Sequence, residues 1–336
     1  MTGRYSRQEL FHPIGPDGQE KLSRARVLVI GAGALGAASA EMLVRAGVGS
    51  LTIADRDYVE WSNLQRQQLY TEQDVIDHMP KAAAAEKRLR LINSSVQVTG
   101  IVADVTAEKA LELAEEASLI VDATDNFETR LIMNDAAVKL GIPFLYGACV
   151  ASYGITYSVI PGKTPCLHCL LGHLPANTMT CDTAGVIGPV VQQVAAYQVT
   201  DALKLLTGHE PSGMLRSFDI WTNERSEVRA DALKHETCPT CGKGEFPFLS
   251  AENETKAAVL CGRQTVQIRP AAEQPLELES LAAKLKKAGL NVTGNHYLVS
   301  CRAEDFKFVI FRDGRALIHG TNDINRAKTI YHRWIG

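Results

Sequence analysis

Three glycines have the spacing of a phosphate-binding turn. Gly31, Gly33 and Gly36 follow an apolar run and open a helical pattern. Glycines at such a strand–helix turn let phosphate oxygens approach backbone N–H groups at a helix N-terminus. Asp55 ends the next apolar run, where a carboxylate accepts hydrogen bonds from ribose hydroxyls. Together they predict a nucleotide site, with a glycine-rich turn that binds no ligand as the alternative.

Polar residues downstream of Asp55 suit a triphosphate better than a dinucleotide. The motif SNLQRQ contributes Asn63, Arg66 and Gln67, and Lys81 follows it. Cations at this place neutralise phosphate charge while one phosphorus is attacked. A hydride-transfer enzyme has no need for them, so we favour ATP over NAD. A solvated loop with incidental charges is the alternative, and it is the better interpretation of Arg66 taken alone.

The motif DATDN closes a further apolar run with two carboxylates, Asp122 and Asp125, and with Asn126. Carboxylates at the carboxyl end of a parallel strand face the ligand crevice. One of them can hold Mg²⁺, which prefers one or two carboxylates together with phosphate oxygens. Alternatively, Asp122 bonds to backbone, and Asp125 or Asn126 caps the following helix.

Four of the eight cysteines form two Cys-x-x-Cys pairs, Cys166 with Cys169 and Cys238 with Cys241. Two such pairs make a tetrahedral thiolate cage for Zn²⁺. In a chain without a visible secretory signal, metal is favoured over disulfides. His168 could compete as a ligand, but a histidine inside such a pair usually points outward. A redox dithiol or unrelated buried cysteines are the alternatives.

These residues need an α/β framework that holds them at one edge of a sheet. Apolar runs alternate with helical patterns, which predicts a Rossmann-like, doubly wound, mostly parallel sheet. Two antiparallel strands should extend it, at 155–162 and 214–222, with a helix at 189–206. The expected parallel strands are 26–30, 51–55, 96–102, 119–124 and 143–148, and the expected helices between them are 34–46, 81–92, 106–117 and 127–140.

A composition change after Cys241 predicts two domains, a nucleotide-binding domain at 1–248 and a small α+β module at 249–336. Residues 242–256 read as a linker. In the module, Thr321 or Asn322 is expected to cap the last helix. Its other predicted elements are strands at 257–262, 264–269, 296–301 and 306–311 and a helix at 276–288.

The composition indicates a globular protein, since 46% of its 336 residues are hydrophobic and 22% charged. A net charge of −3 gives no reason to expect nucleic acid or a membrane surface as a partner. The N-terminus lacks an apolar signal region, and no uncharged apolar stretch is long enough to cross a bilayer. We therefore expect a cytoplasmic protein.

Taken together, the motifs resemble the adenylating domain of ubiquitin-activating enzymes and, most closely, their bacterial relatives of the HesA/MoeB/ThiF family. The resemblance runs from Arg4 to about Cys241. SNLQRQ followed by DATDN carries it more specifically than the glycines do. Position 34 is Ala34, where the family usually has glycine, and alanine still suits a helix start. The tail at 249–336 lies outside the resemblance and suggests no chemistry of its own.

The resemblance implies ATP- and Mg²⁺-dependent adenylation of the C-terminal Gly-Gly carboxylate of a ubiquitin-like sulfur carrier. The carrier would be ThiS-like, in thiamine thiazole synthesis, or MoaD-like, in molybdopterin synthesis. Phosphates would contact Asn63, Arg66, Lys81 and neighbouring Gln67. Ribose would lie near Asp55 and Asp57, and Mg²⁺ at Asp125 next to Asn126. The family's zinc corresponds to the four paired cysteines.

The resemblance also implies partners. Arg7 matches an arginine that the family donates to the neighbour's ATP site, so the active form would be a homodimer. Cys181 matches an acceptor cysteine that forms a thioester or persulfide-derived bond, and a loop cysteine of no consequence is the alternative. The sulfur itself would come from a cysteine desulfurase or from another sulfur donor. We hypothesise that the tail contacts the carrier or stabilises the dimer.

Two other functions compete with adenylation. The first is an NAD-dependent oxidoreductase with a structural zinc, supported by the glycines and Asp55 but opposed by Arg66, Lys81 and DATDN. The second is a non-catalytic module that keeps the nucleotide fold and only docks a carrier-like partner. The presence of Arg66, Lys81 and Asp125 argues against that module.

Overall fold

The structure, a computed structural model, describes residues 3–170, 181–250, 257–260, 264–269 and 275–335. The chain divides into two compact units. The first consists of Met1–Glu72, Pro80–Asn177 and Val186–Asn253. The second consists of Gln73–Met79, Thr178–Gly185 and Glu254–Gly336, so it includes two short segments that interrupt the first unit in the sequence.

An eight-stranded sheet in the order β3-β2-β1-β4-β5-β6-β7-β8 forms the centre of the first unit. Strands β3 to β5 of this order run parallel, and β6, β7 and β8 add to the β5 edge in antiparallel pairs. The strands are β1 (Arg26–Ile30), β2 (Ser50–Asp55), β3 (Gln97–Val102), β4 (Leu119–Asp122), β5 (Phe144–Val150), β6 (Tyr153–Val159), β7 (Met214–Asp219) and β8 (Glu224–Arg229).

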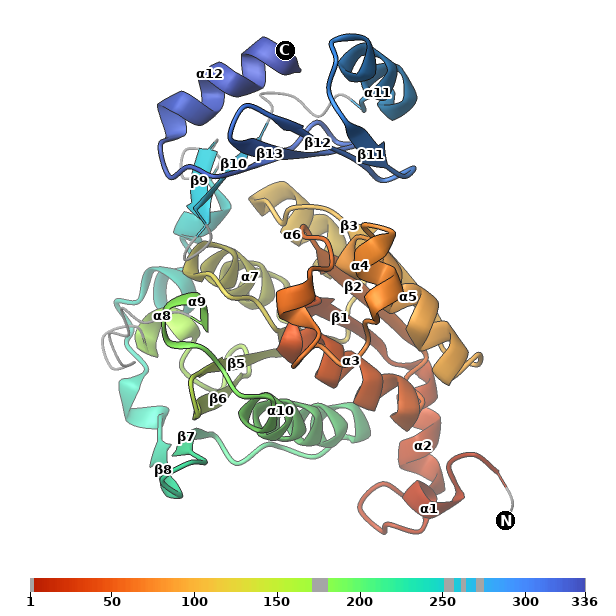
Figure 1. The fold of residues 1–336 in the computed structure, drawn as a ribbon. Coiled ribbons are helices and arrows are strands. Elements are labelled where there is room, and N and C mark those ends of the chain that lie inside the picture. The colour runs from red at the N-terminus through yellow and green to blue at the C-terminus, as the bar shows by residue number, and fades with distance from the viewer. Residues whose placement is uncertain (1–2, 171–180, 251–256, 261–263, 270–274, 336) are drawn as a thin grey trace. The chain divides into compact units, whose positions relative to one another are not determined.

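Helices cover both faces of the parallel strands (Figure 1). On one face α3 packs against α5 and α10, and on the other α6 packs against α7. Glycines in the left-handed region end three of these helices, because they alone adopt that conformation without a steric cost. The five helices are α3 (Ala34–Ala46), α5 (Lys81–Ile92), α6 (Ala107–Ala114), α7 (Phe127–Leu140) and α10 (Gly188–Thr207).

Shorter helices connect or flank these elements. α1 (Ser6–Glu9) and α2 (Gly15–Arg24) precede β1, and α4 (Glu72–Ile76) precedes α5. α8 (Leu167–Leu170) begins inside the first cysteine pair, and α9 (Cys181–Ala184) precedes α10. No helix among the described residues is both long and apolar enough to span a bilayer.

The predicted α/β sheet is confirmed, and 34–46, 81–92 and 127–140 are helices with those bounds. Two expectations were wrong in part. The segment expected as a strand at 214–222 ends earlier and turns into β8, whose six residues are all exposed and therefore show no apolar alternation. Part of the expected linker is packed, since Phe248 and Leu249 contact the core cluster that includes α6 and α7.

The C-terminal part of the second unit is an antiparallel sheet in the order β11-β12-β13-β14-β10-β9. Helices α11 (Leu278–Lys287) and α12 (Ile324–Trp334) pack on the same face of it, over one apolar cluster. The strands are β9 (Ala257–Leu260), β10 (Thr265–Ile268), β11 (Val292–Gly294), β12 (Leu298–Ala303), β13 (Phe306–Phe311) and β14 (Ala316–His319).

The module is α+β, as predicted, with three local differences. The strand expected at 296–301 is shifted to β12, and the short β11 was not predicted. The cap of α12 is Asp323, whose Oδ1 accepts hydrogen bonds from Asn325 N and Arg326 N. The expected cap Thr321 instead accepts a hydrogen bond from Asp323 N, one step earlier in the turn.

Candidate functional site

The carboxyl ends of β1, β2 and β4 meet at one edge of the large sheet. In the strand register Ile30 is opposite Ala54 on one side and Asp122 on the other. Gly31, Asp55 and the DATDN motif therefore begin at the same level of the sheet. In open α/β sheets this edge is where ligands bind.

Two of the three glycines are required by packing at this edge. A Cβ on Gly31, whose φ is +94°, would lie 2.5 Å from Ala123 O. A Cβ on Gly36 would lie 1.8 Å from Gly31 O, so any side chain there would separate helix α3 from the turn. Gly33, the N-cap of α3, has more room, since its nearest neighbour would be Gln67 Nε2 at 3.9 Å. Space thus remains at the helix N-terminus.

Asp55 braces the glycine turn. Its Oδ2 accepts a hydrogen bond from Ala32 N at 2.6 Å, and its Oδ1 accepts one from Asp57 N at 2.7 Å. Burial raises the pKa of the Asp55 carboxyl above its ordinary value, against the opposing effect of nearby Lys81. Asp55 therefore fixes the backbone of the turn, and its contact with ribose stays a prediction.

Lys81 is buried at the start of α5 and pairs with a carboxylate. Its Nζ lies 3.1 Å from Asp57 Oδ2, and its backbone N donates to Asp57 O at 2.9 Å. Only 3% of Lys81 is exposed. A buried ammonium keeps its charge when an anion stands beside it. Lys81 is held at this edge by its pairing with Asp57.

The SNLQRQ segment is folded by its own polar groups. Asn63 Oδ1 accepts a hydrogen bond from Glu60 N at 3.1 Å and so caps the 3₁₀ turn Trp61–Asn63. Arg66 Nη1 donates to Ser62 O at 2.9 Å, and Arg66 is half-buried. Gln67 is buried, and its Oε1 accepts no hydrogen bond from the described residues. Such an orphaned acceptor beside Gly33 fits a ligand that supplies a donor.

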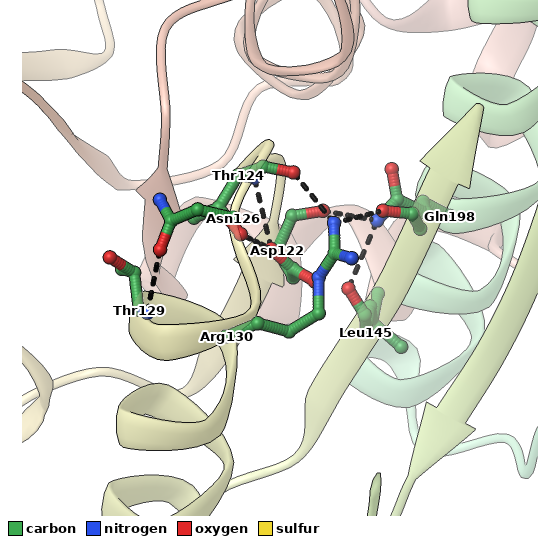
Figure 2. Close-up of polar contacts among 8 residues, drawn as sticks. Asp122, Thr124, Asn126, Thr129, Arg130, Leu145 and Gln198 are labelled. Carbon is green, nitrogen blue, oxygen red and sulfur yellow. Dashed lines mark hydrogen bonds and ion pairs between the residues drawn. The ribbon is translucent and has the colours of Figure 1, made fainter. Parts of the chain in front are cut away.

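Three polar residues of the DATDN motif have different roles in the structure. Asp122 is buried and accepts hydrogen bonds from Arg130 Nε at 2.7 Å and from Thr124 Oγ1 at 2.7 Å (Figure 2). Asn126 Oδ1 caps α7 by accepting a hydrogen bond from Thr129 N at 2.8 Å. Asp125 lies between them and is exposed. Of the two carboxylates, Asp125 is therefore the one open to a metal ion and phosphates.

Three residues that the sequence analysis did not select complete this edge. Gln198 on α10 donates to Asp122 O at 2.7 Å and to Leu145 O at 3.0 Å, which joins the helix to β4 and β5 (Figure 2). Arg130 also donates to Thr124 O at 2.6 Å. Burial lowers the pKa of Arg56, but Asp104 and the site carboxylates raise it more, so it stays charged. In the sequence, the only sign that Arg56 belongs to the site is its position between Asp55 and Asp57.

The four paired cysteines come together in the structure. Cys166 Sγ lies 3.6 Å from Cys238 Sγ, and Cys169 Sγ lies 3.5 Å from Cys241 Sγ. All four sulfur atoms lie within 4.8 Å of one another. A tetrahedral Zn²⁺ with bonds of about 2.3 Å requires sulfur atoms roughly 3.8 Å apart, so the cluster fits the ion. Burial raises the pKa of the Cys169 thiol to about 11, so a thiolate at this position needs a balancing cation.

Helix α7 is tied to the second cysteine pair through the buried Asp135. Its Oδ1 accepts a hydrogen bond from Thr240 Oγ1 at 2.7 Å, and its Oδ2 accepts one from Phe248 N at 2.9 Å. His168 Nδ1 lies 3.1 Å from Thr240 Oγ1, so this histidine belongs to the network around the cluster and is not one of its four ligands. The helix that starts at DATDN thus also holds the cysteine cluster.

The remaining two predicted site residues are Arg7 and Cys181. Arg7 is exposed on α1, where a second chain could meet it. Cys181 begins α9, and its side chain lies outside the described residues. Their roles stay predictions.

The fold and this edge define an α/β protein of the nucleotide-binding class, with a cluster of four cysteines that fits a metal ion. The family model described as "ThiF family" matches residues 5–240, and the chain belongs to that family. It is 72% identical over 336 residues, all of both chains, to the Bacillus subtilis sulfur carrier protein ThiS adenylyltransferase. It is 34% identical to the Escherichia coli molybdopterin-synthase adenylyltransferase, over 71% of this chain and 96% of that one.

Solved structures agree on the fold. The Escherichia coli MccB structure with MccA-N7isoASN superposes with a TM-score of 0.63, at 23% identity, over 72% of this chain and 76% of that one. The family match ends at residue 240, so the antiparallel module of the second unit lies beyond it. The Bacillus subtilis relative, in contrast, aligns along the whole chain.

Proposed function

We propose that this enzyme adenylates the C-terminal Gly-Gly carboxylate of a ThiS-like sulfur carrier, using ATP and Mg²⁺, in thiamine thiazole synthesis. The observation that carries the proposal is the full-length 72% identity to a ThiS adenylyltransferase, in a chain whose Lys81 and Asp125 stand at the nucleotide edge. The MoaD-like carrier is the second candidate, because a molybdopterin-synthase adenylyltransferase is also a relative. The adenylating activity is assigned to a domain at 1–248.

The chemistry needs positioning and charge neutralisation, with no protein nucleophile. A carboxylate oxygen of the carrier bonds to the α-phosphorus, the bond from that phosphorus to the bridging oxygen breaks, and pyrophosphate leaves. The N-terminus of α3 at Gly33 offers backbone N–H groups to phosphate oxygens. Lys81 and Arg66 supply positive charge, and Gln67 supplies a polar contact beside the turn.

Magnesium would bind at Asp125, the exposed carboxylate of DATDN, and would neutralise phosphate charge there. Zinc would bind Cys166, Cys169, Cys238 and Cys241 and act structurally, because four protein ligands leave no open position for a substrate. It would join the segment at 166–169 to the chain 72 residues later. Both assignments rest on the donor types and their placement.

We also propose that the active form is a homodimer in which Arg7 serves the partner's ATP site. Its exposure on the N-terminal α1 supports this role. Arg7→Ala and Arg66→Ala should each be inactive alone, whereas a mixture should regain part of the activity through heterodimers with one intact site. Failure of the mixture to recover, with dimers confirmed by ultracentrifugation, would argue against the shared site.

ATP–pyrophosphate exchange tests the function as a whole. We expect exchange with Mg²⁺ and a ThiS-like carrier, and none with a carrier whose terminal Gly-Gly has been removed. Exchange with a MoaD-like carrier alone would move the enzyme to the other pathway. No exchange with either carrier, in a folded zinc-loaded dimer, would contradict adenylation.

A further inference from the structure

The second compact unit includes a segment that belongs, by sequence, to the nucleotide site. Gln73–Met79 is grouped with Glu254–Gly336. This segment is the chain between the SNLQRQ motif and Lys81, and Met79 is separated from Lys81 by Pro80 alone. Whatever holds the segment therefore acts, through two peptide bonds, on the residue that presents the buried ammonium.

Asn295 makes the contacts that hold it. Its Nδ2 donates to Asp77 O at 2.9 Å and to His78 O at 3.1 Å. Its Oδ1 accepts hydrogen bonds from Tyr297 N at 2.9 Å and from Leu298 N at 3.1 Å. Both ends of the side-chain amide are used, so the turn before β12 fixes the direction in which the two N–H bonds point.

The backbone of this segment has a strained conformation that the hydrogen bonds of Asn295 stabilise. His78 has a φ of 51°, in the left-handed region that a histidine adopts at a cost of about 1 kcal/mol or more. The turn is closed locally by Met79 N, which donates to Asp74 O at 2.9 Å. Asn295 bonds the carbonyl groups of the left-handed residue and of the residue before it, which are the groups that would otherwise reorient.

The residues that follow this turn make contacts at the nucleotide edge. Tyr58 and Pro80 form a β-bridge, and Lys81 N donates to Asp57 O. Lys81 Nζ then meets Asp57 Oδ2. Met79 is the one residue between His78, which Asn295 contacts, and Pro80, which pairs with Tyr58. The backbone between these two points therefore has few free dihedral angles.

We infer that Asn295 is a positioning residue for ATP: the C-terminal module holds the turn at 77–78 and so sets where Lys81 presents its ammonium to the phosphates. The inference rests on the proposed function. It gives the module, which lies beyond the family match, a part in nucleotide affinity. Asn295 touches no reacting atom, so losing its contacts should weaken ATP binding more than it slows the chemical step.

The substitution Asn295→Asp separates the two halves of the side chain. The carboxylate keeps the acceptor for Tyr297 N and Leu298 N but cannot donate to Asp77 O or His78 O. Asn325→Asp is the matched control, because it adds the same charge to the same module at an exposed position. Both full-length variants should be folded and dimer-competent to the same degree as the parent.

In carrier-dependent pyrophosphate exchange, Asn295→Asp should raise the KM for ATP about tenfold, with kcat and the KM for the carrier changed less than twofold. Hydrogen exchange of the ligand-free protein should be faster at residues 77–82 in this variant alone. A KM for ATP equal to that of Asn325→Asp, or unchanged exchange at 77–82, would overturn the inference. If the parent itself showed no pyrophosphate exchange, the proposed function would fail, and the hydrogen-exchange comparison would still decide whether Asn295 holds the turn.

Discussion

The nucleotide edge and the cysteine cluster both gather groups that become negatively charged, but they balance the charge differently. At the nucleotide edge, Asp122 meets Arg130 and Asp57 meets Lys81, so cations of the chain itself do most of the balancing. In the cluster, four sulfur atoms crowd within 4.8 Å, which suits an external cation. We therefore expect the first region to be organised before its ligand arrives, and the second to need a bound ion for its stability.

The largest effect expected at the nucleotide edge concerns Asp125, the exposed carboxylate of DATDN. Asp125→Ala should lower carrier-dependent adenylation at least about 1,000-fold, because phosphate charge would lose its metal-binding carboxylate. The thermal midpoint should stay within a degree or two of the parent, since Asp125 is exposed. Glu115→Ala, at another exposed carboxylate, is the control and should be fully active. Substantial activity in Asp125→Ala would move the Mg²⁺ site elsewhere.

Breaking the internal charge balance should cost stability instead. Asp122→Asn leaves the buried Arg130 guanidinium without its anion, which typically costs about 3–5 kcal/mol of unfolding free energy. Urea unfolding would measure it. The double variant Asp122→Asn with Arg130→Met should lose less than the two single losses added together. Full additivity would mean that the pair does not act as a unit.

Removing a cluster ligand tests the dependence on an external ion. Cys166→Ser should release zinc from one ion per chain to nearly none, and should lower stability by several kcal/mol, because metal binding contributes to folding. Zinc content by mass spectrometry and urea unfolding would report the two effects. Cys301→Ser, at a buried cysteine outside the cluster, should keep its zinc. Retained zinc in Cys166→Ser would disprove its role as a ligand.

The smallest effect should come from the link between the two regions. Thr240→Val removes the hydroxyl that donates to Asp135, at an expected cost of about 1–2 kcal/mol, with zinc still bound. Thr329→Val, on an exposed face of α12, is the control and should lie within about 0.5 kcal/mol of the parent. If the two variants were equally stable, the hydrogen bond to Asp135 would not hold the second cysteine pair in place.

The sequence predicted what depends on local pattern. Apolar runs placed β1 and α5, and glycine stops also fixed the ends of α3 and α7, because these signals lie within or next to each element. Cysteine spacing was sufficient to select the four members of the cluster. It could not place β8, whose exposed residues lack an apolar face, nor the packed stretch around Phe248, which reads as polar linker.

The roles within DATDN needed three-dimensional contacts. Its two aspartates and its asparagine are equally plausible as ligands or caps from sequence, and only Arg130 and the Thr129 amide distinguish them. Asp135 and Gln198 were missed for the same reason, since each acts through partners more than 50 residues away. No local pattern marks a buried polar residue whose partners come from distant elements.

Helix α7 has almost no side that faces water. Its nine residues from Thr129 to Ala137 are all buried, and they include Arg130 near one end and Asp135 near the other. Most helices tolerate change on one face, but here each position already has a neighbour to satisfy. In a saturation-mutagenesis experiment, this stretch should accept the narrowest set of amino acids. Substitutions elsewhere in the chain would be tolerated only where they still pack against these residues.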